Sequence, residues 1–284
     1  MSRHTTVPFH RRKSTAAAAA TGAVALLGAG LLFSNAFATG PATAAKPVLP
    51  KANATFDYQI GAPYAPAPGV KVVSRDRSAK PAKGLYNICY VNAFQAQPDA
   101  LSWWQKHHPS LILKDKNNRT VMDENWGEAL LDTSTTAKRN ELAAVVGQWI
   151  NGCATSGFQA VEPDNLDSYQ RSKGLLTKAD NSAFAKLIVQ KAHAKGLAIG
   201  QKNTAEMLSE HTRIGFDFAV AEECAEYSEC GSYAKAYSNR VYVIEYEDHS
   251  FDKACSSWGK SLSIVQRDLD VTARGSDDYT FRTC

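Results

Sequence analysis

Short runs of apolar residues recur along the chain from residue 56 onward, and each has the length and composition of a β-strand. The runs cover residues 56–60, 70–73, 86–91, 158–161, 197–200, 216–220, 241–244 and 262–265. Between the later runs, apolar residues recur at helical spacing, which predicts helices over 136–153, 180–195 and 204–213. Alternating strands and helices are typical of a parallel sheet. Eight such strands in one domain predict an α/β fold, the (β/α)8 TIM barrel.

The spacing of the runs is irregular at the front of the predicted barrel. Only residues 61–69, which include three prolines, separate the first two runs, and a parallel crossover normally needs a dozen residues or more. We therefore expect short, irregular first crossovers, the second over 74–85. Residues 92–157, by contrast, form a long insertion between strands three and four, with a predicted hairpin over 111–122. In a barrel this insertion would lie over the C-terminal face, where substrates bind.

Residues 1–45 have the composition of a signal peptide and leader. A basic start, Arg11-Arg12-Lys13, precedes an apolar run over 16–33 and two small-residue cleavage sites. The apolar run is near the lower length limit for a membrane span, so an uncleaved anchor is the alternative. We expect a linker over 46–53 and one barrel domain over 54–284. The protein is then secreted, with no stable membrane contact after cleavage.

The charge balance argues against one class of partner. Four of the 32 Lys and Arg residues lie in residues 1–45, which leaves 28 basic residues to balance the 28 acidic ones in the rest of the chain. No polybasic stretch remains there to bind nucleic-acid phosphates. We therefore expect no nucleic-acid partner, and by default a monomer.

All six cysteines lie after residue 45, and an even number in an exported chain favours disulfides. Many pairings are open; we favour Cys224–Cys230, because its loop is short, together with Cys255–Cys284 and Cys89–Cys153. No Cys-x-x-Cys or His-Glu-x-x-His motif occurs in the sequence, and we expect neither a metal site nor a cofactor.

Polar residues gather where the predicted strands end. Glu162, Asp164 and Asp167 crowd into six residues after the fourth run, close enough to repel one another and to shift each other's pKa values. Further polar residues lie within or after five other runs: Asp57, Gln59, Asn92, Lys202, Asn203, Glu222, Glu223, Glu245 and Tyr246. In a barrel all of these would point toward one mouth, which indicates an acidic functional site. The alternative is that strand ends simply enter solvent.

Two carboxylates facing each other across a pocket are what glycoside hydrolysis requires, because one protonates the leaving oxygen and the other attacks the sugar or activates water. Aromatic residues near the mouth could stack on sugar rings, although packing explains each one singly: Tyr58, Tyr90, Trp126, Tyr169, Tyr227 and Tyr246. Two alternatives stay open. One is a non-catalytic carbohydrate-binding barrel, and the other is a different enzyme with a metal ion held by the acids.

At these residues the chain resembles family 114 of the glycoside hydrolases, which includes endo-α-1,4-polygalactosaminidase. The phrase Glu162-Pro163-Asp164-Asn165-Leu166-Asp167 carries the resemblance most specifically. Weaker matching segments follow the family's order: 56–60, 88–93, 126–132, 157–161, 196–203, 222–224 and 244–246. The chain departs from the family's pattern at residues 94–97 and at Ala221, which implies a difference in fine specificity.

The resemblance implies an enzyme that cleaves within chains of α-1,4-linked galactosamine, as in galactosaminogalactan. It implies that Asp164 and Glu222 are the catalytic pair, which we interpret as the nucleophile and the general acid/base of a retaining mechanism. The substrate-binding residues that we expect are Asp57, Gln59, Tyr90, Asn92, Trp126, Glu162, Asp167, Lys202, Asn203, Glu245 and Tyr246. Free galactosamine is a cation, and a ring of carboxylates would attract it.

Overall fold

The computed structural model describes residues 46–284. The predicted signal peptide and leader lie outside the described residues. Residues 46–53, predicted as a linker, form no helix or strand and lie against the barrel, where the hydroxyl groups of Tyr86 and Tyr242 each donate a 2.7 Å hydrogen bond to their carbonyls. Within residues 46–284, no helix combines the length and the hydropathy that crossing a membrane requires.

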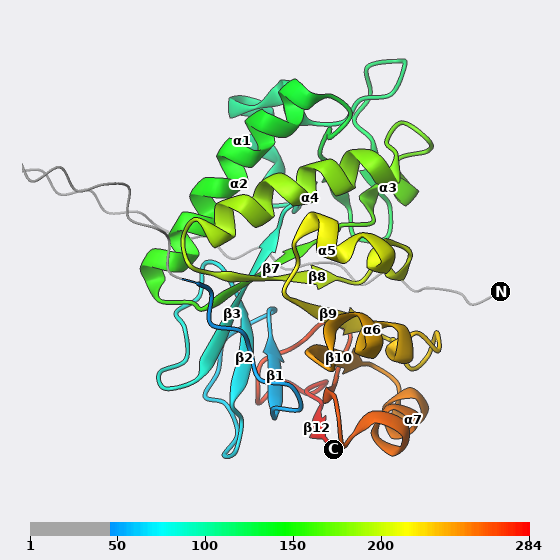
Figure 1. Cartoon of the computed structure of the whole chain (residues 1–284). Helices are drawn as coiled ribbons and strands as arrows, with labels where there is room; N and C mark the ends of the chain where they lie inside the picture. The colour runs from blue at the N-terminus through cyan, green and yellow to red at the C-terminus, as the bar shows by residue number, and fades with distance from the viewer. Residues whose placement is uncertain (1–45) are drawn as a thin grey trace, which may run out of the picture. The chain divides into compact units, whose positions relative to one another are not determined.

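Parallel strands form a nearly closed barrel with helices on its outside (Figure 1). In chain order around the barrel they are β1 (Phe56–Gln59), β2 (Val72–Asp76), β3 (Tyr86–Asn92), β7 (Ala160–Asp164), β8 (Ala198–Lys202), β9 (Phe218–Glu222), β10 (Val241–Glu245) and β11 (Ser263–Arg267). β12 (Phe281–Thr283) pairs antiparallel with β11. β1 and β11 lie side by side, but within the described residues they form no hydrogen-bonded ladder. The predicted (β/α)8 TIM barrel is therefore confirmed, with one open seam.

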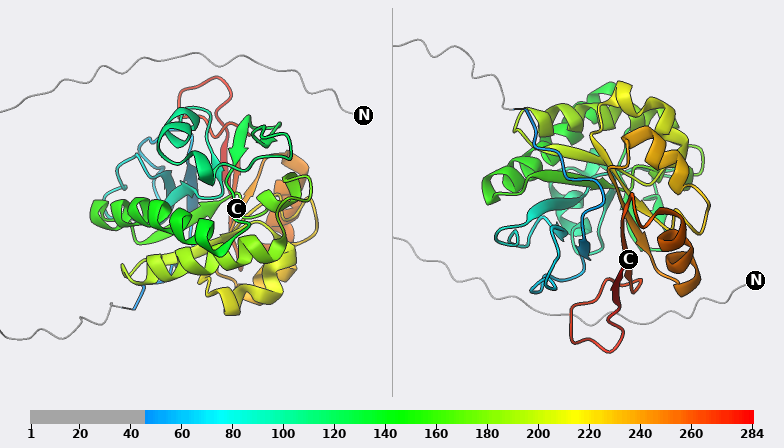
Figure 2. Two further views of the ribbon diagram at one scale, coloured as in Figure 1. Left: turned by 90° about the horizontal axis from the view of Figure 1, so that it is seen from above. Right: turned by 60° about the horizontal axis from the view of Figure 1, so that its bottom comes forward.

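The later crossovers carry the helices. They are α2 (Thr136–Ser156), α3 (Ser168–Arg171), α4 (Lys178–His193), η2 (Ala205–Glu210), α5 (His211–Ile214), α6 (Cys230–Tyr237) and α7 (Asp248–Trp258). The segment predicted as one helix over 204–213 is a 3-10 helix followed by the short α5. α2 and α4 pack side by side on the outside of the barrel (Figure 2). Both start after a threonine N-cap, Thr135 and Thr177, whose side chain accepts a backbone hydrogen bond.

The front of the barrel is as irregular as its spacing predicts. In the described part of the chain, no helix separates β1, β2 and β3 (Figure 1). The insertion between β3 and β7 contains β4 (Gln95–Ala96), α1 (Leu101–His107), η1 (Pro109–Leu111), β5 (Met122–Asp123) and β6 (Glu128–Leu130). β6 lies between β4 and β5 in a small antiparallel sheet. The predicted hairpin is present, since an antiparallel bridge joins Lys114 to Thr120.

The lumen of the barrel changes from apolar to polar along the strands. At its N-terminal end Phe56, Ile88, Phe218 and Tyr242 form a buried cluster, and each such side chain stabilises the fold by about 1.5–3 kcal/mol. Gly200 makes room for Phe218, because a Cβ at residue 200 would lie 2.7 Å from that ring. Two to four residues further along β3, β7, β8 and β9, the same face carries polar groups, since side chains alternate with a period of two. This polar end of the lumen is the C-terminal mouth.

All three favoured disulfides are confirmed. Cys89–Cys153 joins β3 to α2, Cys224–Cys230 closes the loop after β9, and Cys255–Cys284 ties the C-terminal residue to α7. Among residues 46–284 no cysteine is free.

Candidate active site

A single buried lysine lies at the centre of the mouth. The ammonium group of Lys202, at the end of β8, lies 3.0 Å from Glu162, 3.2 Å from Asp164 and 3.4 Å from Glu222. It also donates a 3.0 Å hydrogen bond to the Tyr58 hydroxyl. The strand β8 lies between β7 and β9, so the chain brings these three carboxylates around one cation from neighbouring strands.

The three carboxylates differ in depth. Glu162 is fully buried, whereas the side chain of Asp164 is 19% exposed and that of Glu222 is 23% exposed. Glu162 accepts hydrogen bonds from the hydroxyls of Tyr58 and Ser74 in addition to its contact with Lys202. Of these three acids, Glu162 is therefore a buried partner for the lysine, and Asp164 and Glu222 are the two that a ligand in the mouth can reach.

Each of the two exposed acids is held by several donors. Asp164 accepts a 2.7 Å hydrogen bond from the Tyr90 hydroxyl and a 2.8 Å bond from the backbone N–H of Asn165. Glu222 accepts a 2.8 Å bond from the Asn203 side chain and a bond from the Tyr246 hydroxyl. The Lys202 ammonium contacts one oxygen of Asp164 and one oxygen of Glu222. The distance between these two oxygens therefore cannot exceed the sum of the two contact distances. The predicted pair therefore lies close together around one lysine.

The charges at the mouth set distinct protonation states. Burial alone would raise the pKa of Asp164, but Lys202, the Tyr90 hydroxyl and the Asn165 amide outweigh burial and hold that pKa below its usual range. Burial raises the pKa of Glu162 despite the opposing effect of Lys202. The surrounding carboxylates raise the pKa of the Lys202 ammonium well above its usual range, although burial opposes them. Asp164 is thus ionised and Lys202 charged at neutral pH.

Residues in the left-handed region follow all three strand ends. Asn165, Asn203 and Glu223 have φ values of 66°, 46° and 56°, immediately after Asp164, Lys202 and Glu222. Asparagine adopts this conformation readily, but it is costly for glutamate. The turn at Asn203 also lets its side chain oxygen accept a 2.8 Å hydrogen bond from the Glu222 amide. The sharp turns therefore fix the direction of the functional side chains.

Glu128, which the strand-end pattern missed, lies beside this group of acids. It belongs to β6 of the insertion, and its Oε2 accepts hydrogen bonds from the side chains of Asn92 at 2.8 Å and Asn165 at 3.2 Å. Burial, together with the charges of Asp164 and Asp123, raises the pKa of Glu128 to about 7, although the hydrogen bond from Asn92 opposes this. The residue was hidden because it follows no barrel strand; its one sequence signal was its place in the segment 126–132.

Several predicted substrate-binding residues lie in other surroundings. Asp57 and Gln59 are fully buried and bind Tyr64 and Arg75 instead of the Lys202 cluster. They alternate with the lumen-facing Phe56 and Tyr58, so the expectation that all strand-end polar groups share one mouth is wrong for them. Asp167 forms a 2.8 Å ion pair with Arg171.

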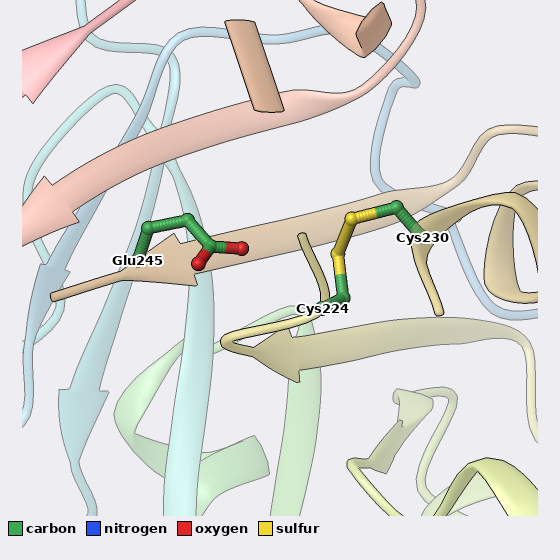
Figure 3. Close-up of side chains that lie close together, drawn as sticks. All are labelled: Cys224, Cys230 and Glu245. Carbon is green, nitrogen blue, oxygen red and sulfur yellow. A yellow bond between two sulfur atoms is a disulfide. The ribbon is translucent and has the colours of Figure 1, made fainter. Parts of the chain in front are cut away.

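Two further expected residues also differ in exposure. Trp126 is 58% exposed on the insertion. Glu245 is fully buried beside the Cys224–Cys230 disulfide (Figure 3), where one oxygen accepts a 2.8 Å hydrogen bond from the Ala225 amide. In the described residues these three side chains form the only cluster of His, Cys, Asp or Glu compact enough for a metal ion. Both sulfurs are bonded to each other, so they are not available as ligands.

A surface cavity of about 540 Å³ lies away from the acids, between the loops that replace the first two helices. Pro63, Tyr64, Pro81 and Leu85 line part of it, and no carboxylate is among its lining residues in the described chain. General acid–base chemistry therefore belongs to the mouth and not to this cavity.

Comparisons with known proteins assign the chain to a family and relate its fold to solved structures. The sequence profile of glycoside-hydrolase family GH114 matches residues 36–284. No curated protein matches the sequence. The fold resembles the crystal structure of Aspergillus fumigatus Ega3 in complex with galactosamine, with a TM-score of 0.68, 22% identity, and coverage of 84% of this chain and 98% of that one. It also resembles the glycoside hydrolase domain of PelA from Pseudomonas aeruginosa, with a TM-score of 0.55, 14% identity, and coverage of 80% and 98%. The family profile spans most of the chain, which therefore belongs to glycoside-hydrolase family GH114 and is a glycosyl hydrolase.

Proposed function

We propose that the protein is a secreted, endo-acting hydrolase of α-1,4-linked galactosamine polymers, with Asp164 and Glu222 as its catalytic pair. The observation that carries the proposal is the position of these two partly exposed acids on either side of Lys202. Ega3, a structure of the same fold, binds galactosamine. The three disulfides support an oxidising, extracellular location.

Asp164 suits the role of nucleophile, because its low pKa keeps it ionised. Glu222 would protonate the glycosidic oxygen while Asp164 attacks the anomeric carbon, forming a glycosyl–enzyme ester and releasing the leaving chain as an alcohol. Glu222 would then take a proton from water, which attacks the anomeric carbon, breaks its bond to Asp164 and releases that carboxylate. The spacing of the two acids supports retention. Their Lys202-bound oxygens can be separated by the roughly 5–5.5 Å of retaining pairs. The same contacts exclude all but the shortest of the roughly 6.5–9.5 Å separations of inverting pairs.

The charge of the mouth supports a cationic substrate. Glu162, Asp164 and Glu222 share one lysine, and Glu128 adds a further carboxyl group. A surplus of negative charge in a concave site raises the local concentration of cations. Tyr90, Asn92, Asn203 and Tyr246 orient the acids at the rim, and Trp126 is placed on the exposed insertion, where a ring can stack on a sugar.

Digestion of a defined α-1,4-galactosamine oligomer tests the proposal. We expect Asp164→Asn and Glu222→Gln each to lower kcat by about 10³-fold or more, because each removes a group that acts in the transition state. Glu141→Gln, an exposed acid on α2, is the matched control and should leave kcat unchanged. NMR detection of the first-formed anomer distinguishes retention from inversion. Undiminished cleavage by either site variant contradicts the catalytic pair, and tight binding without cleavage by the unaltered protein favours a carbohydrate-binding barrel.

A further inference from the structure

We propose that Glu128 is a specificity-determining residue that binds the ammonium group of a sugar seated beside Asp164, so that the enzyme prefers free galactosamine to its N-acetylated form. This proposal rests on the proposed hydrolase function and assigns a substrate contact that the catalytic pair does not explain. It stands on three features of the structure: the position of Glu128, the direction of its hydrogen bonds, and the lack of a cation paired with it.

The position of Glu128 places a carboxyl group next to the proposed nucleophile. Asn165 bridges the two acids, because its backbone N–H donates to Asp164 at 2.8 Å and its side chain donates to Glu128 at 3.2 Å. Asn92, which pairs with Asp164 across β3 and β7, donates to Glu128 at 2.8 Å. Glu128 therefore lies next to Asp164, on the side of the mouth that the insertion forms, and a sugar whose anomeric carbon meets Asp164 would have its C2 substituent near Glu128.

The hydrogen bonds of Glu128 leave one oxygen open. Both amide donors, from Asn92 and Asn165, bind the Oε2 atom. Within residues 46–284, no protein donor binds the other oxygen, Oε1. The carboxyl group is thus held in a fixed direction by neutral donors while half of its acceptor capacity remains for a ligand.

No cation forms an ion pair with Glu128 in the described part of the chain, although the charge of Arg171 acts on it without direct contact and opposes the rise of its pKa. Lys202 contacts the other three acids, and Arg171 pairs with Asp123 at 2.7 Å and with Asp167 at 2.8 Å. The raised pKa of Glu128 agrees with this geometry, since burial and neighbouring negative charges are its main causes. An ammonium ion against Oε1 would supply the missing positive charge and a charge-assisted hydrogen bond. A neutral acetamide would supply no charge.

The test compares kcat/KM of the full chain on an α-1,4-galactosamine oligomer and on its fully N-acetylated counterpart. Glu128→Gln keeps an oxygen that can accept from an amide but removes the negative charge. We expect it to lower kcat/KM about 10- to 100-fold on the amine substrate, the cost of a hydrogen bond to a charged group, and less than about threefold on the acetylated one. Glu124→Gln is the matched control: it lies in the same insertion, is exposed, and among residues 46–284 forms an ion pair only with Lys173, at 3.5 Å. It should change neither value.

A pH profile adds a readout that a merely structural role would not move. Glu128 must be ionised to attract the amine, so kcat/KM of the unaltered enzyme on the amine substrate should fall as pH drops through about 7, and this acid limb should vanish in Glu128→Gln. Equal losses on both substrates would overturn the proposal and point to Glu128 as a general acid or a structural residue.

If the unaltered chain cleaves neither oligomer, the hydrolase proposal fails by itself. Calorimetric binding then decides on Glu128: selective weakening of amine binding in Glu128→Gln supports the assignment, and unchanged binding rejects it.

Discussion

At the scale of single residues, Lys202 determines the charge state of the whole site. It is 1% exposed and is surrounded by Glu162, Asp164 and Glu222. A buried lysine in apolar surroundings loses its proton readily, but three nearby carboxylates reverse that tendency here. The same cation keeps the pKa of Asp164 low. Lys202 therefore links the stability of the barrel to the reactivity of the acid that we propose as nucleophile.

Replacing Lys202 with methionine should harm both stability and activity. Removal of one partner leaves buried negative charge uncompensated, so we expect a loss of about 3–5 kcal/mol in the free energy of unfolding, measured with urea at pH 7. The pKa of Asp164 should rise without its ammonium neighbour, so the loss of kcat/KM caused by protonation of Asp164, which is separate from that of Glu128, should begin at higher pH. Lys186→Met, on the exposed face of α4, should stay within about 0.5 kcal/mol. Adding Glu162→Gln to Lys202→Met should recover part of the stability but not the activity. If Lys202→Met unfolds like the unaltered protein, the ionic role of the lysine is wrong.

At the scale of elements, the sequence predicts the barrel well and the strand ends poorly. The apolar runs at 158–161, 197–200 and 216–220 stop two or three residues before β7, β8 and β9 end. The strand residues that the apolar runs leave out include Glu162, Asp164, Lys202 and Glu222, which hydropathy assigns to loops. They belong to strands because Lys202 neutralises the acids inside the barrel, and that depends on partners up to 40 residues away in sequence, which no local pattern contains.

Asp57 and Glu128 show the two opposite errors of the strand-end rule. Asp57 belongs to a strand that ends at the mouth, but its side chain lies on the opposite face of that strand from Tyr58. It therefore contacts Tyr64 and Arg267 and not the Lys202 cluster. Glu128 lies on no barrel strand, yet the small sheet of the insertion carries it to Asn92 and Asn165. The rule predicts which end of the barrel is functional. The face of each residue and the path of the insertion come from tertiary packing.

The turn after β9 offers a prediction about strain. Glu223 adopts a φ of 56°, and burial and nearby carboxylates raise the pKa of its side chain. Glu223→Gly relieves both the backbone strain and the charge repulsion, less the entropy cost of glycine, so it should stabilise the fold by about 0.5–1 kcal/mol. Glu223→Gln keeps the strain while removing the charge, and should gain less. Thermal unfolding measures the difference. A Glu223→Gly protein no more stable than Glu223→Gln would show that the turn is not strained.

At the scale of the whole barrel, one of the three disulfides lies at the edge where the hydrogen-bonded ladder is weakest. The seam between β1 and β11 lacks a ladder in the described chain, and β12 adds to β11 at that edge. Cys255–Cys284 anchors the end of β12 to α7, across 29 residues of sequence. Cys224–Cys230, by contrast, closes only 6 residues, directly after Glu222. One bridge therefore supports the closure of the barrel, and the other holds the loop behind a proposed catalytic acid.

Removing these two bridges separately should affect stability and activity to different extents. In the loop-entropy picture, Cys255→Ser with Cys284→Ser costs about 3–4 kcal/mol of unfolding free energy, and Cys224→Ser with Cys230→Ser costs about 2 kcal/mol, because the second loop is shorter.

The loss of activity should follow the reverse order and be larger for the Cys224–Cys230 variant. The Cys224–Cys230 loop begins one residue after the left-handed Glu223, so its release loosens the turn that directs Glu222, whereas the C-terminal bridge contacts none of the acids around Lys202. Urea unfolding and kcat/KM on the galactosamine oligomer, measured on the same preparations, give both orders. Both variants are compared at a temperature where both are folded. If the variant without Cys255–Cys284 then loses more activity than the variant without Cys224–Cys230, the position of Glu222 depends on the closure of the barrel and not on its own loop.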